Sequence, residues 1–92
     1  MDETTQLLVL KQNLQQLTDA NDEYLKTLLK HAESLMTREG IKNDKSQDYI
    51  MAKIDYAAFL FRKRANSNIK MPLHLRYELN NILMSQKMKD DI

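Results

Sequence analysis

The sequence has 92 residues, of which 29% are charged and 42% are hydrophobic, and its net charge is +1. These values predict one soluble globular domain with a modest core. The absence of cysteine excludes disulfides and thiolate metal sites. No apolar run approaches the roughly 18 residues of a membrane span, and we do not expect the acidic, polar N-terminus to be a signal peptide.

A single Gly and a single Pro leave few positions for tight turns, which favours helices over strands. We expect an all-α fold, a small bundle of four helices at about residues 4–17, 22–38, 46–65 and 72–87. A flexible polar tail is expected at residues 88–92.

The first two helices each have one apolar stripe at a spacing of three or four residues. The first stripe consists of Leu7, Leu10, Leu14 and Leu17. The segment TDANDEY then offers N-cap residues, and the second helix carries Leu25, Leu28, Leu29, Ala32, Leu35 and Met36. Leu29 lies at the centre of its stripe and is predicted to be buried. Gly40 follows the last turn, where a left-handed cap favours glycine.

The third and fourth helices each carry two apolar stripes. In the third helix, which Asp44 or Ser46 can cap, one stripe is Ile50, Ile54, Ala57, Ala58 and Phe61, and the other is Tyr49, Ala52, Tyr56, Phe59 and Leu60. Ile54 is predicted to be buried. In the fourth helix, whose first turn suits Pro72, the stripes are Leu75, Leu79, Ile82 and Leu83, and Leu73, Tyr77, Met84 and Met88.

A chain of this length has too little core to bury both faces of two helices. We therefore expect the second stripe of each helix to be contact surface for partners. The alternative is that the third helix is central, with its tyrosines half exposed.

No arrangement of residues predicts catalysis. His31 and His74 belong to different helices, neither lies in a metal-binding motif, and both are predicted to be surface residues. One Gly rules out a glycine-rich phosphate loop, and no Ser or Thr lies in the context of a nucleophile. We predict that the protein is not an enzyme and needs no metal or cofactor.

Charge is distributed unevenly along the chain. Residues 1–23 carry one Lys and five acids, a net of −4, whereas residues 45–92 carry nine Lys or Arg and five acids, a net of +4. Within the basic half, Arg62, Lys63 and Arg64 are candidate contacts to a DNA backbone. They project about 100° apart around the helix, and they also occupy a C-terminal turn, where cations complement the helix dipole.

Three stretches resemble the head–tail connector family of tailed phages, the head-completion or DNA-packaging adaptor proteins. They are LLVLKQNLQQLTDANDEYLKTLLKHAESLM, YIMAKIDYAAFLFRKRAN and MPLHLRYELNNILM. Together they cover about residues 7–85. Many members of that family have a longer segment between the last two helices, where this chain has only NSNIKM.

The resemblance implies an all-α subunit that joins copies of itself in a ring, typically of twelve, beneath the portal protein. It also implies contact with the next head-completion or tail protein, and non-specific contact with packaged DNA in the channel. The subunit contacts would be Tyr49, Tyr56, Phe59 and Lys63, and the portal-docking residues would be Leu73, Tyr77, Met84 and Met88. The protein would lie at the head–tail junction of the virion, and in the host cytoplasm during assembly, without contact to a membrane.

Two other classes of function remain open. One is a small helical DNA-binding regulator that uses the basic third helix, although the connection at residues 39–45 is longer than the turn of a helix-turn-helix. The other is a free-standing helical dimer that serves as an adaptor.

Overall fold

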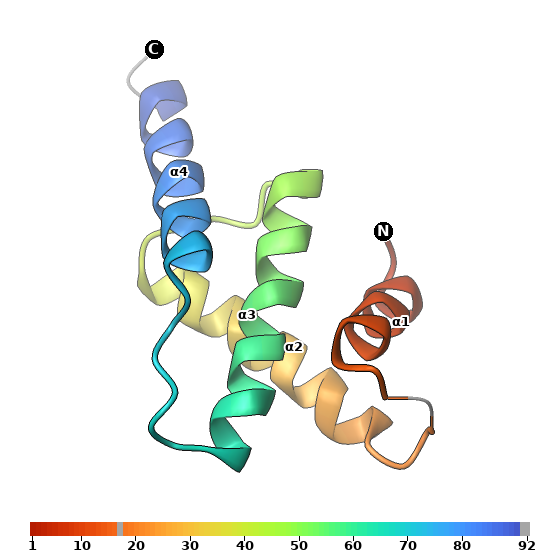
Figure 1. The fold of residues 1–92 in the computed structure, drawn as a ribbon. Coiled ribbons are helices and arrows are strands. Elements are labelled where there is room, and N and C mark those ends of the chain that lie inside the picture. The colour runs from red at the N-terminus through yellow and green to blue at the C-terminus, as the bar shows by residue number, and fades with distance from the viewer. Residues whose placement is uncertain (17, 91–92) are drawn as a thin grey trace.

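The computed structural model describes residues 1–16 and 18–90, and these form four helices and no strand (Figure 1). The helices are α1 (Glu3–Leu14), α2 (Asp22–Arg38), α3 (Gln47–Ala65) and α4 (Leu73–Asp90). The predicted all-α bundle is confirmed. No helix in the described part of the chain is long and apolar enough to cross a membrane.

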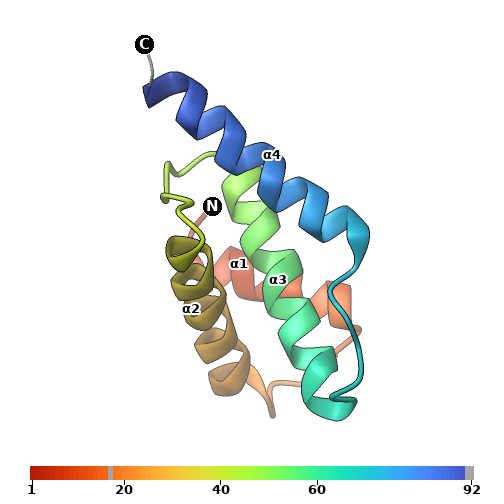
Figure 2. The same ribbon diagram turned by 90° about the vertical axis from the view of Figure 1, so that its left-hand side faces the viewer.

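Helix α3 is the centre of the bundle. It packs against each of the other three helices, and both views place it between α1 on one side and α4 on the other (Figures 1 and 2). Helix α2 runs beside α3 and also contacts α1. The last turns of α4 project past the start of α3. One central helix thus carries most of the packing between helices.

Helix α1 is shorter than predicted. The carboxylate of Asp2 accepts a hydrogen bond from the Thr5 N–H at 2.7 Å and caps the first turn. At the other end, Gln15 adopts a left-handed conformation with φ 57°, and its N–H donates to carbonyl groups of the last turn. The helix therefore ends at Leu14. Leu17, the last leucine of the predicted stripe, lies outside the described residues.

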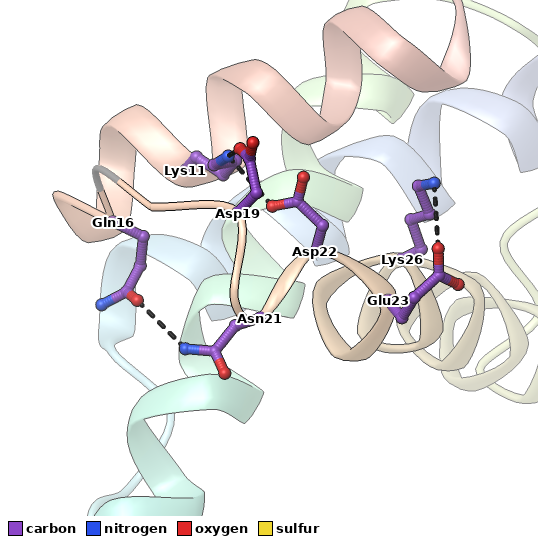
Figure 3. A network of polar contacts seen from close by, with 7 residues as sticks. All are labelled: Lys11, Gln16, Asp19, Asn21, Asp22, Glu23 and Lys26. Carbon is purple, nitrogen blue, oxygen red and sulfur yellow. Dashed lines mark hydrogen bonds and ion pairs between the residues drawn. The ribbon is translucent and has the colours of Figure 1, made fainter.

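A network of polar contacts ties the end of α1 to the start of α2 (Figure 3). The ammonium group of Lys11 lies 2.7 Å from a carboxylate oxygen of Asp19 and 2.9 Å from one of Asp22. The Asn21 amide donates to the Gln16 side chain at 3.2 Å. Single exposed ion pairs contribute only about 0–1 kcal/mol, but this Lys is mostly covered and serves two acids. The acidic segment is thus partly neutralised within the chain.

The end of α2 confirms the predicted glycine cap. Gly40 has φ +90°, and its N–H donates to the Thr37 carbonyl, while the Ile41 N–H donates to the Met36 carbonyl. These two bonds define a Schellman motif, in which the residue after the glycine commonly makes an apolar contact with the helix. Ile41 fits that pattern, since it is buried in the core. The motif turns the chain from α2 toward α3.

Ser46 caps α3, one of the two predicted alternatives. Its hydroxyl accepts a hydrogen bond from the Tyr49 N–H at 3.1 Å. Asp44 instead accepts a hydrogen bond from the Ser46 N–H at 3.0 Å. Hydrogen bonds from the side chain and the backbone of Ser46 lower the pKa of the Asp44 carboxyl. The loop before α3 is thereby ordered by its own side chains.

Helix α4 differs from the prediction at both ends. It begins just after Pro72, whose carbonyl accepts the first helical hydrogen bond, from the Arg76 N–H. It continues to Asp90, so residues 88–90, which the sequence placed in a flexible tail, belong to the helix. Residues 91–92 lie outside the described part. The segment KMK contains good helix formers and basic residues that complement the end of the dipole.

Two polar contacts fasten α4 to the end of α2 and the loop that follows. Arg76 pairs with Glu39. The Gln86 amide group accepts a hydrogen bond from the Lys42 N–H at 2.8 Å and donates to the Lys42 carbonyl at 2.7 Å. The apolar packing of α4 is mainly against α3, and these polar contacts join it to a second part of the bundle.

The buried side chains form one apolar cluster with members from all four helices. Leu29 and Ile54 both belong to it, as predicted. The largest fully buried side chains are Leu10, Leu25, Met36, Ile41, Tyr49, Ile54, Leu75 and Leu79. Residues near and far in the sequence therefore share a single core.

Ile54→Ala should lower the free energy of unfolding by about 2–5 kcal/mol, because truncating a buried aliphatic side chain removes packing and leaves a cavity. Leu73→Ala is the control, because Leu73 is 70% exposed and its truncation should cost less than about 0.5 kcal/mol. Urea denaturation followed by circular dichroism measures both. Equal losses would contradict the assignment of the buried face.

Candidate protein-docking surface on α4

The second stripe of α3 is not a surface. Tyr49 is fully buried, and Tyr56 and Phe59 are 8% and 7% exposed. The prediction that these three residues make contacts between subunits is therefore wrong, and the alternative of a central helix is correct, with tyrosines buried more deeply than it expected. Lys63, the fourth predicted contact, is exposed, and its ammonium group lies 5.8 Å from the centre of the Phe59 ring.

The burial of α3 has a simple cause. Three helices surround it, so most residues of both stripes are buried, and of its large apolar side chains only Met51, Leu60 and Phe61 are partly exposed. Desolvation raises the pKa of Tyr49 to about 12, and it also raises the pKa of Tyr56. The Tyr49 hydroxyl is buried without a hydrogen-bond partner among the described residues. Both tyrosines thus behave as interior groups.

The second stripe of α4 is a surface, as predicted. Leu73, Tyr77, Met84 and Met88 are 70%, 61%, 61% and 67% exposed. They are four of the six large hydrophobic side chains that are exposed in the described residues, the others being Met1 and Leu8. The four occupy one face of the helix along most of its length. We call them the outer face of α4.

The outer face exists because α4 lies at the edge of the bundle. Its opposite side contributes Leu75, Leu79 and Ile82 to the core, and α3 is the main helix on which that side rests. No described helix covers the outer face (Figures 1 and 2). An exposed apolar row of this kind is typical of a site that binds another protein. Methionine, which supplies half of the row, adapts readily to the shape of a partner.

The basic run at the end of α3 has partners inside the chain. A guanidinium nitrogen of Arg62 donates to the side chain of Asn13 at 3.0 Å, and the guanidinium of Arg64 stacks on Tyr24 at 4.5 Å from the ring centre. Lys63 lies near Phe59, as described above. The three cations therefore have neighbours on α1, α2 and α3 instead of forming one patch. This arrangement favours a structural role in joining the helices over a DNA-backbone contact.

The histidines occupy the predicted positions, since His31 and His74 are both exposed. Within the described residues, no group of three or more His, Cys, Asp or Glu side chains is placed to hold a metal ion. Lys53, a residue that the sequence did not single out, is buried on α3 and lies 3.6 Å from a Glu33 carboxylate oxygen on α2. Such a pair is commonly structural.

The sequence analysis also missed an acidic groove between α3 and α4. A groove of about 470 Å³ is lined by residues that include Asp44, Asp48, Glu78 and Lys89. Burial of Glu78, and then the negative charges of Asp55 and Asp48, raise the pKa of its carboxyl group to about 7. Nothing in the sequence showed that Glu78 of α4 would line the same groove as Asp48 of α3.

No protein-family model, curated protein or solved structure matches this chain. The assignment of the outer face of α4 as a candidate docking surface therefore rests on the exposure of its four residues in this structure.

Replacing both Tyr56 and Phe59 by Ser should destabilise the isolated protein by at least about 3 kcal/mol, because each buried ring is lost to a small polar group. The matched control replaces Tyr77 and Met84 by Ser, which should change stability by about 1 kcal/mol or less, since both are exposed. Thermal melts followed by circular dichroism decide between them. Similar melting temperatures for the two double variants would contradict the burial of α3.

Proposed function

We propose that this protein is a non-enzymatic subunit of a phage head–tail connector, and that the outer face of α4 docks on the portal protein. The single observation that carries the docking site is the exposed row of Leu73, Tyr77, Met84 and Met88. Covering such a row removes apolar surface from water, which favours association by roughly 25 cal/mol per Å² before the costs of binding.

The resemblance of residues 7–85 to the connector family supports the choice of partner. In that family the C-terminal region commonly docks on the portal, and α4 is the C-terminal helix of this chain. The row is long enough to engage a partner along several helical turns. The proposed mechanism of the protein is architectural: the subunit extends the portal channel and offers a platform for the next tail component.

The contacts between copies in the ring lie elsewhere than we expected. Tyr49, Tyr56 and Phe59 are core residues, so of the four predicted subunit contacts only Lys63 remains exposed. A ring subunit must present two different surfaces to its two neighbours, because the contact is head to tail. We place no further residues at these contacts.

The DNA-binding regulator receives no support from the geometry. Arg62 and Arg64 are engaged with Asn13 and Tyr24, and a phosphate contact would compete with those interactions. Non-specific contact with DNA passing through the channel needs no dedicated site, since it depends on the total charge that faces the lumen.

Met84→Lys should weaken binding to the portal protein of the same phage by at least about tenfold, because docking would bury an unpaired charge. A pull-down on purified portal assemblies, quantified by titration, measures the loss. The matched control is Leu8→Lys, which places the same charge at an exposed apolar residue on α1, and which should leave binding unchanged.

Both variants should retain the wild-type circular dichroism spectrum, since both sites are exposed. Point substitution is preferable to removal of the last turns of α4. Gln86 fastens α4 to the loop at Lys42, so a truncation would remove this contact together with part of the outer face. Full-strength portal binding by the Met84→Lys variant would reject the outer face as the docking site. Failure of the wild-type chain to bind portal would reject the connector function itself.

A further inference from the structure

The outer face of α4 is symmetric about its midpoint. Leu73 and Met88 lie equally far from the midpoint along the helix, and Tyr77 and Met84 lie equally far from it on the turns between them. At 3.6 residues per turn, the four side chains project within about 60° of one another around the helix axis. Turning the helix end over end about the midpoint therefore puts an apolar side chain where an apolar side chain was before.

Two asparagines occupy the midpoint of the row. Asn80 and Asn81 are both exposed, and helical spacing places them on opposite margins of the outer face. An amide side chain has both hydrogen-bond donors and acceptors, so it can pair with a second copy of itself. An Asn within an apolar helix contact commonly fixes the register of two helices. The centre of the row thus suits a contact between identical chains.

A two-fold contact between identical chains requires a surface of this kind, because residue i of one copy meets residue j of the other and j meets i in return. With the axis at the midpoint of the row and the two helices antiparallel, Leu73 lies level with Met88 of the second copy. Tyr77 then lies level with Met84 of the second copy, and methionine sulfur packs favourably against an aromatic ring. A surface for an unrelated protein has no need of this symmetry.

The charges around the outer face are compatible with the antiparallel arrangement. The row and the two asparagines at its midpoint carry no charge, so two copies meet there without like-charge repulsion. Antiparallel pairing also places the positive end of each helix dipole beside the negative end of the other. His74 and Lys87 are exposed at the margins of the face, where solvent screens their charge.

The size of the contact sets its strength. The four apolar side chains are 61–70% exposed. Together with the two amides they would bury on the order of 1,000 Å² over both copies, at roughly 100 Å² for each side chain. Specific, stable interfaces bury about 1,200–2,000 Å². The contact is therefore of the size expected for a reversible dimer.

We propose that the isolated protein forms a reversible dimer in which the α4 helices of two copies pair antiparallel through their outer faces. This pairing is a property of the chain and does not depend on the connector function. In the proposed function the same face docks on the portal, so the pair would open before docking.

Sedimentation equilibrium of the wild-type protein alone, from about 1 μM to about 1 mM, tests for the pair. The mean mass should rise from that of a monomer to that of a dimer within this range, because the interface is small. Met84→Lys and Tyr77→Glu should each raise the dissociation constant by at least about tenfold, since each would bury an unpaired charge in the contact. Leu8→Lys, at an exposed residue of α1, is the control and should dimerise as wild type does.

Combining Tyr77→Glu with Met84→Lys tests the direction of the helices. In the antiparallel pair each introduced glutamate lies level with the introduced lysine of the second copy, so the double variant should dimerise at least about tenfold more tightly than either single variant. In a parallel pair each introduced charge would meet its own copy, and the double variant would be the weakest of the three.

Circular dichroism of every variant should match that of wild type, since the substituted residues are exposed. If a charged variant does not fold, replacing Tyr77 and Met84 by Ser removes the apolar contact without a charge and should likewise leave the chain monomeric. A wild-type protein that stays monomeric up to about 1 mM would overturn the proposal. So would a dimer that Met84→Lys leaves intact, or a double variant no tighter than the single ones. No portal protein is present in these measurements, so their outcome is separate from that of the docking test.

Discussion

The enclosure of α3 by the other three helices is the constraint on which the rest of the structure depends. Ala52, Ala57 and Ala58 are fully buried or nearly so, and small side chains let neighbouring helices approach closely. Polar contacts also join α3 to two of its neighbours: Lys53 pairs with Glu33 on α2, and Arg62 donates to Asn13 on α1. Since Tyr49, Tyr56 and Phe59 of α3 are buried among these helices, they are not free for a partner.

The position of α4 is the consequence that bears on function. A helix at the edge of a bundle has one face toward the core and one toward solvent, and in α4 both are apolar. Solvent exposure of Tyr77 and Met84 has no benefit for folding, because the core is complete without them. An exposed apolar row of this kind is typical of a surface that binds another protein.

Much of the charge in the sequence is used inside the molecule. Lys11 joins Asp19 and Asp22 between α1 and α2, and Arg64 stacks on Tyr24. The apparent division into an acidic and a basic half is therefore a poor guide to partners. The basic run at the end of α3 contacts residues on three helices, because the side chains of a helical turn project in different directions around the helix axis.

The sequence by itself determined the four helices, the glycine cap at Gly40 and the burial of Leu29 and Ile54, and it narrowed the cap of α3 to Asp44 or Ser46. These features follow from local rules, namely periodicity, capping chemistry and a left-handed glycine. Only the tertiary structure decided which of the two-striped helices is central and which lies at the edge. Both helices show the same periodicity, and periodicity records that a face is apolar without recording what covers it. The groove lined by Asp48 and Glu78 was hidden for the same reason, because it depends on how α4 lies against α3.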